Sequence, residues 1–129
     1  MREIKYRGKR VDNSEWVYGY VYHDQRFNNG VSCCDVMIIR DECDEDFEVK
    51  ENTVGQCTGR IDESDVEIYE DDKVVVEGDN EEPGVVVWDD DELEWGIDVG
   101  NIRMKMGCFY SRDIAIIGNV HDNPELLEV

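Results

Sequence analysis

Long apolar stretches are missing from this 129-residue sequence. A membrane-spanning helix needs about 18 or more consecutive apolar residues, and no run approaches that length. The opening residues, MREIKYRGKR, also lack the apolar centre of a secretory signal peptide. We therefore expect neither a membrane span nor export.

Cysteines at useful spacings are missing as well. The five cysteines are an odd number, and Cys33 and Cys34 are adjacent, which suits no ordinary disulfide between them. Zinc sites commonly use a C-x₂₋₄-C pair, and no two cysteines here have that spacing. Unpaired thiols without an export signal are typical of the reducing cytoplasm, so we predict a cytoplasmic protein without a zinc site.

The signatures of common catalytic sites are absent. The sequence contains no G-x-S-x-G, no phosphate-binding glycine loop and no H-E-x-x-H. Asp122 follows His121, but neighbouring residues on an extended chain face opposite ways and do not form a base and its orienting acid. The acidic stretches DDDELEWG and DECDEDFE do not fit an EF-hand loop, because each has a residue without a side-chain oxygen at one ligand position, Leu93 or Cys43, and neither has glycine at position 6. We expect no enzyme, no cofactor and no metal; a carboxylate-based hydrolase stays open because acids are abundant.

Basic residues are scarce. Lysine and arginine total 13 against 33 aspartates and glutamates, for a net charge of −20. The first ten residues hold five basic residues and one acid, so this segment carries +4 and the remainder carries −24. Such a body repels nucleic acid and acidic membranes within a Debye length of about 8 Å. We therefore expect a protein partner, with direct nucleic-acid binding disfavoured and no membrane contact.

Alternation of apolar and polar residues predicts β-structure in the first half of the chain. In the stretch EWVYGYVYH, the four aromatic residues Trp16, Tyr18, Tyr20 and Tyr22 share one face. Four aromatics on one strand are usually a core face or a cross-strand ladder. The predicted segments are strands over 3–9, 15–23 and 36–40, a loop over 24–30 with a turn signal at Asn29-Gly30, and acidic connectors over 41–48 and 60–66.

The second half shows short strands separated by short polar turns, a pattern typical of a small antiparallel barrel. The acids Glu70, Asp71 and Asp72 are expected to lie outside the core. Asn123 and Pro124 predict one C-terminal helical turn. The predicted strands cover residues 73–78, 84–89, 93–99, 102–106 and 114–120.

Three ordered blocks carry a resemblance to a known family. They are REIKYRGKRVDNSEWVYGY (2–20), TVGQCTGR…EIYEDDKV (53–74) and IIGNVHDNPELL (116–127). With these blocks, nearly the whole chain resembles the YopX family of phage and prophage proteins. The resemblance implies a phage or prophage origin, a bacterial host cell, SH3-like barrel character and an oligomer, and it transfers no catalytic residue. The strand pattern, with a soft boundary near 58–66, predicts a mainly β fold of two parts, an N-terminal β subdomain (1–58) and an SH3-like barrel subdomain (59–129), with one compact unit as the alternative.

The family usually has glycine where this chain has Asp71 and tyrosine where it has Cys57. If position 71 requires a positive φ, aspartate is among the better residues other than glycine, at a cost of about 1 kcal/mol. The turn is therefore predicted to survive.

The residues selected as a candidate interaction surface combine cations, aromatics and acids. We expect a non-enzymatic accessory protein that binds protein and self-associates. The alternative is an acidic inhibitor that imitates DNA and binds a host DNA-binding protein, because duplex DNA presents about one charge per 1.7 Å of axis. The selected residues are Lys5, Arg7, Lys9, Trp16, Tyr18, Asp89, Asp90 and Asp91.

Overall fold

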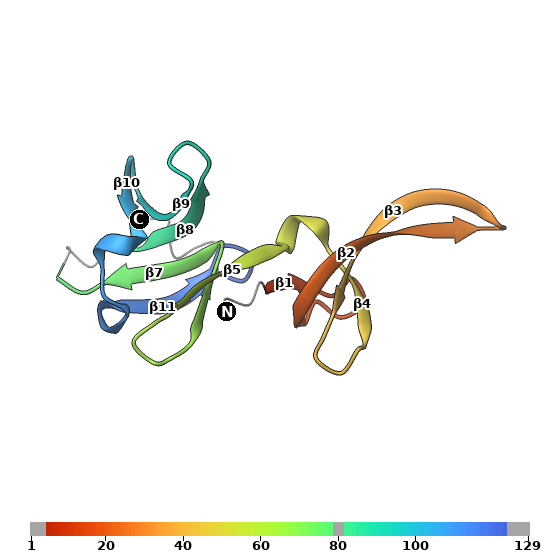
Figure 1. The fold of residues 1–129 in the computed structure, drawn as a ribbon, viewed down its shortest axis with the longest axis horizontal. Coiled ribbons are helices and arrows are strands. Elements are labelled where there is room, and N and C mark those ends of the chain that lie inside the picture. The colour runs from red at the N-terminus through yellow and green to blue at the C-terminus, as the bar shows by residue number, and fades with distance from the viewer. Residues whose placement is uncertain (1–4, 79–81, 124–129) are drawn as a thin grey trace. The chain divides into compact units, whose positions relative to one another are not determined.

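The computed structural model describes residues 5–78 and 82–123, apart from the side chains at positions 26, 28 and 32–34. Over this range the chain forms antiparallel strands and short 3-10 turns, without an α-helix (Figure 1). The mainly β class predicted from the sequence is confirmed. The chain divides into two units, Met1–Gln56 and Cys57–Val129, whereas the sequence analysis placed the boundary after residue 58. The predicted helical turn, from Pro124 onward, lies outside the described residues.

The N-terminal unit is built on a long β-hairpin. Its strands, β2 (Trp16–Asn28) and β3 (Val31–Arg40), are joined by Asn29 and Gly30 alone, whose φ angles are 54° and 79°. Two consecutive left-handed residues form the type I′ turn that matches the twist of paired strands, and Asn-Gly is a preferred pair for it. The loop predicted over 24–30 is therefore wrong outside this turn, because a two-residue connection leaves 24–28 in β2.

Shorter strands flank the hairpin. β1 (Tyr6–Lys9) pairs with the first residues of β2, and β4 (Asp46–Val49) pairs with the last residues of β3. β5 (Gly55–Ile61) follows η1 (Glu51–Thr53) and pairs with β1. The predicted acidic loop over 41–48 is shorter in the structure, since its last residues belong to β4.

One face of these strands is buried in the N-terminal unit. Ile39 is fully buried, Val49 nearly so, and a Cβ placed on Gly8 would lie 3.1 Å from side-chain atoms of both. Gly8 pairs with Val17 in the register of β1 and β2. Because side chains alternate along a strand, the four aromatics at even positions of β2 point to the opposite, outer face. The interpretation of these aromatics as a core face is wrong.

The C-terminal unit contains β6 (Glu67–Tyr69), which pairs with β5, and a five-stranded antiparallel sheet. All five strands of the sheet lie where the sequence predicts strands, with ends shifted by two residues at most. They are β7 (Asp72–Val76), β8 (Gly84–Asp89), β9 (Glu94–Val99), β10 (Ile102–Lys105) and β11 (Ile114–Asn119).

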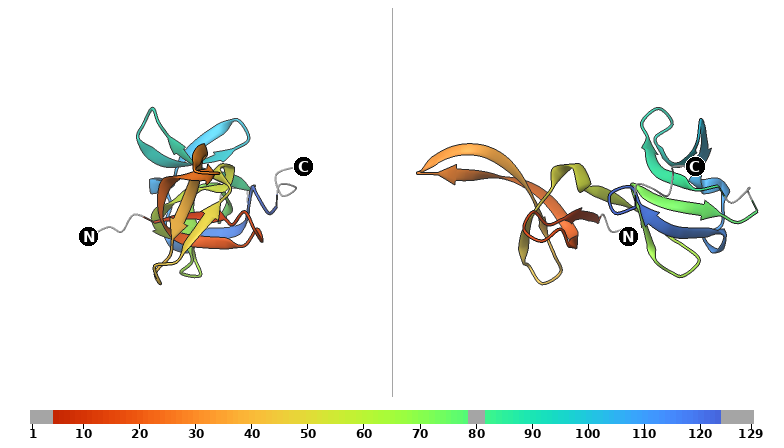
Figure 2. Two further views of the ribbon diagram at one scale, coloured as in Figure 1. Left: turned by 90° about the vertical axis from the view of Figure 1, so that its right-hand side faces the viewer. Right: turned by 180° about the vertical axis from the view of Figure 1, so that it is seen from behind.

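This sheet is open, so the predicted barrel closure is wrong. The strand order is β10-β9-β8-β7-β11, with β10 and β11 at its two edges. Figure 2 shows β7 and β11 side by side from behind, as their register requires. Between β10 and β11 the chain passes through two 3-10 turns, η2 (Met106–Cys108) and η3 (Ser111–Asp113), which replace the strand pairing that would close a barrel.

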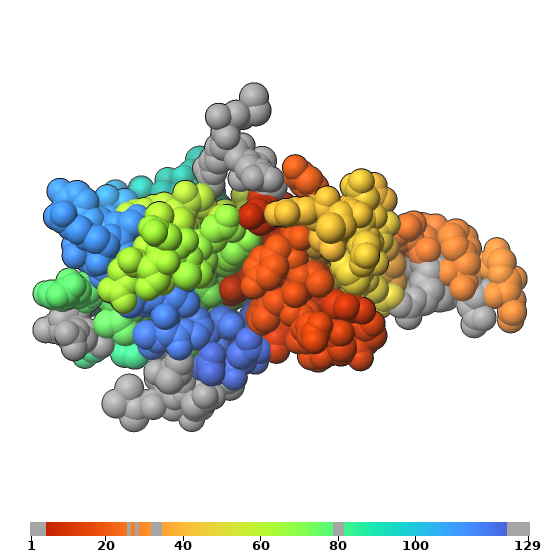
Figure 3. Space-filling model, turned by 90° about the horizontal axis from the view of Figure 1, so that it is seen from below, coloured from red at the N-terminus to blue at the C-terminus, as the bar shows by residue number. Residues whose placement is uncertain are grey.

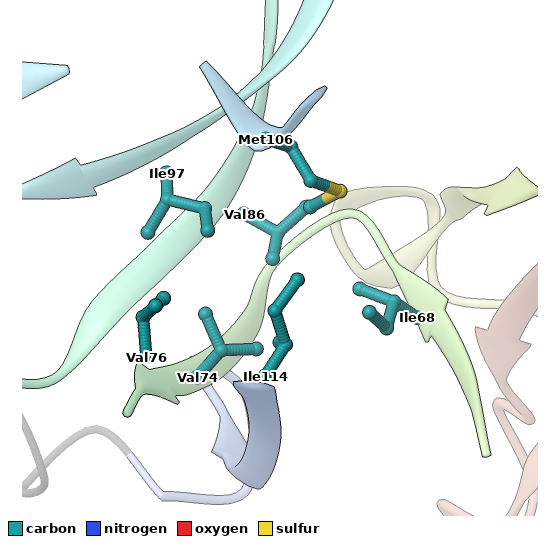
Figure 4. Packing of buried hydrophobic residues seen from close by; sticks show 7 residues of the cluster. All are labelled: Ile68, Val74, Val76, Val86, Ile97, Met106 and Ile114. Carbon is teal, nitrogen blue, oxygen red and sulfur yellow. The ribbon is translucent and has the colours of Figure 1, made fainter. Parts of the chain in front are cut away.

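A small apolar core fills the C-terminal unit. The strands β6, β7, β8, β9 and β11 contribute to it, and η2 adds a methionine (Figure 4). Full burial of one such side chain contributes about 1.5–3 kcal/mol to stability. The core residues are Ile68, Val74, Val76, Val86, Ile97, Met106 and Ile114.

Two charged side chains, half-buried Arg60 and buried Asp62, bind the backbone around this core. The Arg60 guanidinium donates hydrogen bonds to the carbonyls of Met106 and Phe109, both at 2.6 Å. Asp62, only 6% exposed, accepts from the backbone N–H groups of Ser64 and Val66 at 2.9 Å through Oδ1. Its Oδ2 accepts from the Ile116 N–H at 3.3 Å. These side chains supply hydrogen-bond partners where strand pairing ends.

The turn between β6 and β7 carries the acids Glu70, Asp71 and Asp72. Asp72 is 2% exposed and accepts from the Tyr69 N–H at 2.8 Å, so the prediction that all three acids lie outside the core is wrong. Asp71 has φ 70°, which is the positive φ considered for this position. Asp72, which lies next to the core, therefore stabilises the turn itself through the hydrogen bond that it accepts from the Tyr69 N–H.

The Asp62 contacts generate a prediction. Asp62→Ala removes the buried carboxylate that accepts from the N–H groups of Ser64 and Val66, and because hydrogen bonds to a charged group are the stronger ones, it should lower the free energy of unfolding by about 2–3 kcal/mol. Urea denaturation followed by circular dichroism measures this change. Glu63→Ala, at the exposed neighbouring position, is the control and should change stability little. Equal effects of the two substitutions would contradict the prediction.

Candidate interaction surface

The outer face of the N-terminal unit combines aromatic and basic side chains from three strands. In the strand register, Lys9 lies opposite Trp16, Arg7 opposite Tyr18, and Tyr20 opposite Arg40. Directly opposed residues on antiparallel strands point to the same side of the sheet. Four of the sequence-selected residues, Arg7, Lys9, Trp16 and Tyr18, are therefore brought together here.

The Trp16 ring lies beside two cations. The guanidinium carbon of Arg7 is 4.6 Å from the ring centroid, and the ammonium nitrogen of Lys9 is 5.5 Å from it. Both distances are within the range of cation–π attraction. Arg7 itself is buried, so its charge is part of the structure and contributes little accessible surface.

The accessible part of the face is centred on Tyr18 and Tyr20, which are 45% and 62% exposed. Beside them is a pocket of about 50 Å³, lined by Lys5, Gly19, the two tyrosines and residues 40–42. Lys5, which is also one of the sequence-selected residues, thus lines the same pocket as the two tyrosines. Tyr20 and Arg40 were not among the selected residues.

Arg40 is fixed by a carboxylate and an aromatic ring. Its Nε and Nη2 donate to the two carboxylate oxygens of Asp46, at 2.8 and 3.0 Å, and its guanidinium carbon lies 5.6 Å from the Tyr22 ring centroid. The hydrogen bonds from Arg40 lower the pKa of the Asp46 carboxyl. Partial desolvation, and then the neighbouring Asp46, raise the pKa of the Tyr22 hydroxyl. The guanidinium is therefore held in one orientation beside Tyr20.

The acidic turn of the C-terminal unit has a different structure. Asp89 accepts from the N–H groups of Asp91 and Glu92 at 3.0 and 3.1 Å and lies 3.5 Å from Nη1 of Arg103. The hydrogen bond from Glu92, with those from Asp91 and Arg103, lowers the pKa of Asp89. Asp89 therefore closes the turn, and Asp90, Asp91 and Glu92 are exposed.

The two units share the negative charge very unequally. Residues 1–56 hold eight basic and twelve acidic residues, a net charge of −4. Residues 57–129 hold five basic and 21 acidic residues, a net charge of −16. The aromatic–basic face thus belongs to the nearly balanced unit, and the acid excess belongs to the other.

Comparison with known proteins gives a family for this chain. The family model described as "YopX protein" matches residues 5–128. The chain belongs to the YopX family. None of the curated proteins matches it.

The fold of this YopX-family chain is similar to a solved structure titled "Crystal structure of protein EF1440 from Enterococcus faecalis". The TM-score is 0.56 at 20% sequence identity, over 99% of this chain and 100% of the other. At this identity the likeness is one of fold.

The other candidate groups in this YopX-family chain are a histidine and the cysteines. His121 Nε2 lies 3.2 Å from a carboxylate oxygen of Asp71, an acid fifty positions earlier in the sequence. Within residues 5–78 and 82–123, no three metal-binding side chains gather, and no helix has the length and apolar character to cross a membrane. Cys57 is buried, whereas Cys43 and Cys108 are exposed. The side chains of Cys33 and Cys34 lie outside the description.

Gly19 generates a test of this surface's geometry. A Cβ at position 19 would lie 1.9 Å from the carbonyl oxygen of Arg40, so Gly19→Ala must displace β3 backbone at the pocket. We expect a loss of about 1–3 kcal/mol in the free energy of unfolding, measured by urea denaturation. Gly107→Ala is the matched control, because nothing lies within 4 Å of a Cβ there. A fully stable Gly19→Ala protein would contradict this geometry.

Proposed function

We propose that this YopX-family chain is a non-enzymatic accessory protein of a phage or prophage, which acts in the cytoplasm of the host through protein contacts and self-associates. The observation that carries the proposal is the outer face of the N-terminal unit, where exposed Tyr18 and Tyr20 lie beside Arg40. Tyrosine and arginine are enriched among the residues that contribute most to protein–protein binding.

The state of these side chains supports a binding role. A tyrosine offers a large contact area with few rotatable bonds, so little conformational entropy is lost when it is covered. Arg40 already holds one orientation through Asp46, which lowers the cost of ordering it on binding. The modest charge of the N-terminal unit also allows close approach of a second protein, since it carries −4 of the total −20.

The double variant Tyr18→Ala/Tyr20→Ala tests this surface. We expect weakened self-association, by roughly tenfold or more in Kd, because truncating an interface tyrosine commonly costs more than about 1 kcal/mol. Sedimentation equilibrium measures the change. Tyr110→Ala is the control: Tyr110 is 68% exposed and also has an arginine beside its ring, at 4.8 Å, but belongs to the C-terminal unit. Unchanged association of the double variant would count against the proposed surface.

A second function, the imitation of DNA toward a host DNA-binding protein, is favoured by one observation. The −16 charge of the C-terminal unit is concentrated on 73 residues, and the turn between β8 and β9 exposes Asp90 and Asp91. A high density of negative charge attracts proteins that bind phosphate backbones, and the attraction weakens as the salt concentration rises.

Because Asp89 closes the turn, the informative variant leaves it unchanged and alters two exposed acids beside it. Asp90→Asn/Asp91→Asn should leave the fold intact. If the chain imitates DNA, the variant should lose capture of a host DNA-binding protein from lysate at low salt, and duplex DNA should displace that protein from the unaltered chain. Glu45→Gln/Glu51→Gln removes two exposed charges from the N-terminal unit and is the control. Equal capture by both variants, or capture that duplex DNA leaves unchanged, would argue against DNA imitation.

A further inference from the structure

The outer half of the β2–β3 hairpin extends past its neighbouring strands. β1 pairs with β2 only over 16–19, and β4 pairs with β3 only over 37–40. In the described part of the chain, the remaining residues of the two strands therefore have only each other as strand partners. Figure 3 shows the end of this hairpin, in orange, projecting beyond the red and yellow atoms of the same unit.

Such a ribbon gains little stability on its own. An isolated two-stranded hairpin is marginally stable in water, and additional strands or packing are needed to support it. At the tip, Phe27 and Val31 are 61% and 68% exposed, so the ribbon buries few apolar side chains. An added strand would supply backbone hydrogen bonds and would cover some of the exposed apolar side chains.

The two edges of the ribbon are not equivalent. Arg26 pairs with Cys34 and Phe27 with Ser32, so position 33 is an extra residue in β3. A bulge of this kind disrupts the edge on which it lies and discourages strand pairing there. β2 carries no extra residue in this register, so its edge is the regular one and the one suited to strand addition.

The sequence along β2 is complementary to itself. Asp24 and Arg26 lie at equal distances on either side of Gln25. If β2 pairs antiparallel with β2 of a second copy and Gln25 lies on the two-fold axis, each Asp24 position is opposite the Arg26 position of the other copy. His23 then lies opposite Phe27. Opposite charges in directly opposed positions stabilise strand pairs, and a two-fold axis repeats each contact.

We infer that two copies of this chain associate through antiparallel pairing of β2 with β2, centred on Gln25, to give a continuous four-stranded sheet from two hairpins. The inference rests on the self-association in the proposed function and adds its element and register. Nucleic acid is a poor occupant of the same edge, because the ribbon over 20–36 contains two acids and one arginine and so has no excess of positive charge.

Charge reversal tests this register. Asp24→Arg and Arg26→Asp each place like charges opposite one another twice in the dimer, and each should raise the dimer Kd roughly tenfold. The double variant Asp24→Arg/Arg26→Asp restores opposite charges and should associate as the unaltered chain does. Asp35→Arg makes the same charge change on β3 and should leave the dimer Kd unchanged. Sedimentation equilibrium gives the Kd values, and circular dichroism confirms the fold of each variant.

A cross-link provides a second measurement that does not depend on charge. Directly opposed residues of antiparallel strands have Cα atoms about 4.5–5.5 Å apart, within the range of a disulfide. With Cys33, Cys34, Cys43 and Cys108 replaced by serine, Gln25→Cys should form a covalent dimer on mild oxidation, whereas Asp35→Cys should not.

The outcomes separate the two proposals. A monomer at every concentration would overturn self-association and, with it, the pairing of β2. An oligomer that is insensitive to the single charge reversals, or that the double variant fails to restore, would overturn the pairing of β2 alone. Absence of the Gln25→Cys cross-link in an oligomer would do the same.

Discussion

The N-terminal unit depends on a turn of two left-handed residues, Asn29 and Gly30. Because the connection is so short, it determines the register of β2 on β3 from the tip of the hairpin onward. The register shifts by one residue at the bulge. That register brings Tyr20 opposite Arg40 and leaves the other side of the strands to pack on Ile39. The same turn makes both strands long enough to pass their neighbours. The exposed aromatic face and the open edge of β2 are thus consequences of one local geometry.

The C-terminal unit uses charge in two ways. Some acids, such as Asp62 and Asp72, are buried and bind backbone N–H groups, which offsets the cost of removing them from water. Others, such as Asp90 and Asp91, remain in solvent. Acidic composition alone therefore overstates the accessible negative surface. Arg60 acts in the same manner as the buried acids, since it binds carbonyls of η2 and the residue after it where no neighbouring strand does.

Strand positions were predictable where one face is apolar: residues 84–89 form a strand with the predicted ends. Alternation in the sequence also placed the aromatics of β2 on one face, but it did not show which face is buried. The signal for the buried face was the small residues Gly8 and Gly19 on the other side. The sequence predicts a loop over 24–28 because a ribbon that lies in solvent on both faces needs no alternation of apolar and polar residues. The open sheet was not predictable, since the segment between β10 and β11 is held by hydrogen bonds from Arg60, more than forty positions away in the sequence.

The position of β11 has a consequence for synthesis. It is the last described strand in the sequence, yet it pairs with β7, and its Ile116 N–H binds Asp62. Ile114 of the same strand is fully buried in the core. During translation, β7, β8, β9 and β10 emerge from the ribosome before one edge of their sheet has its partner. The C-terminal unit therefore cannot complete its core until β11 has been made, and a chain truncated before Ile114 would expose both apolar side chains and an unpaired strand edge.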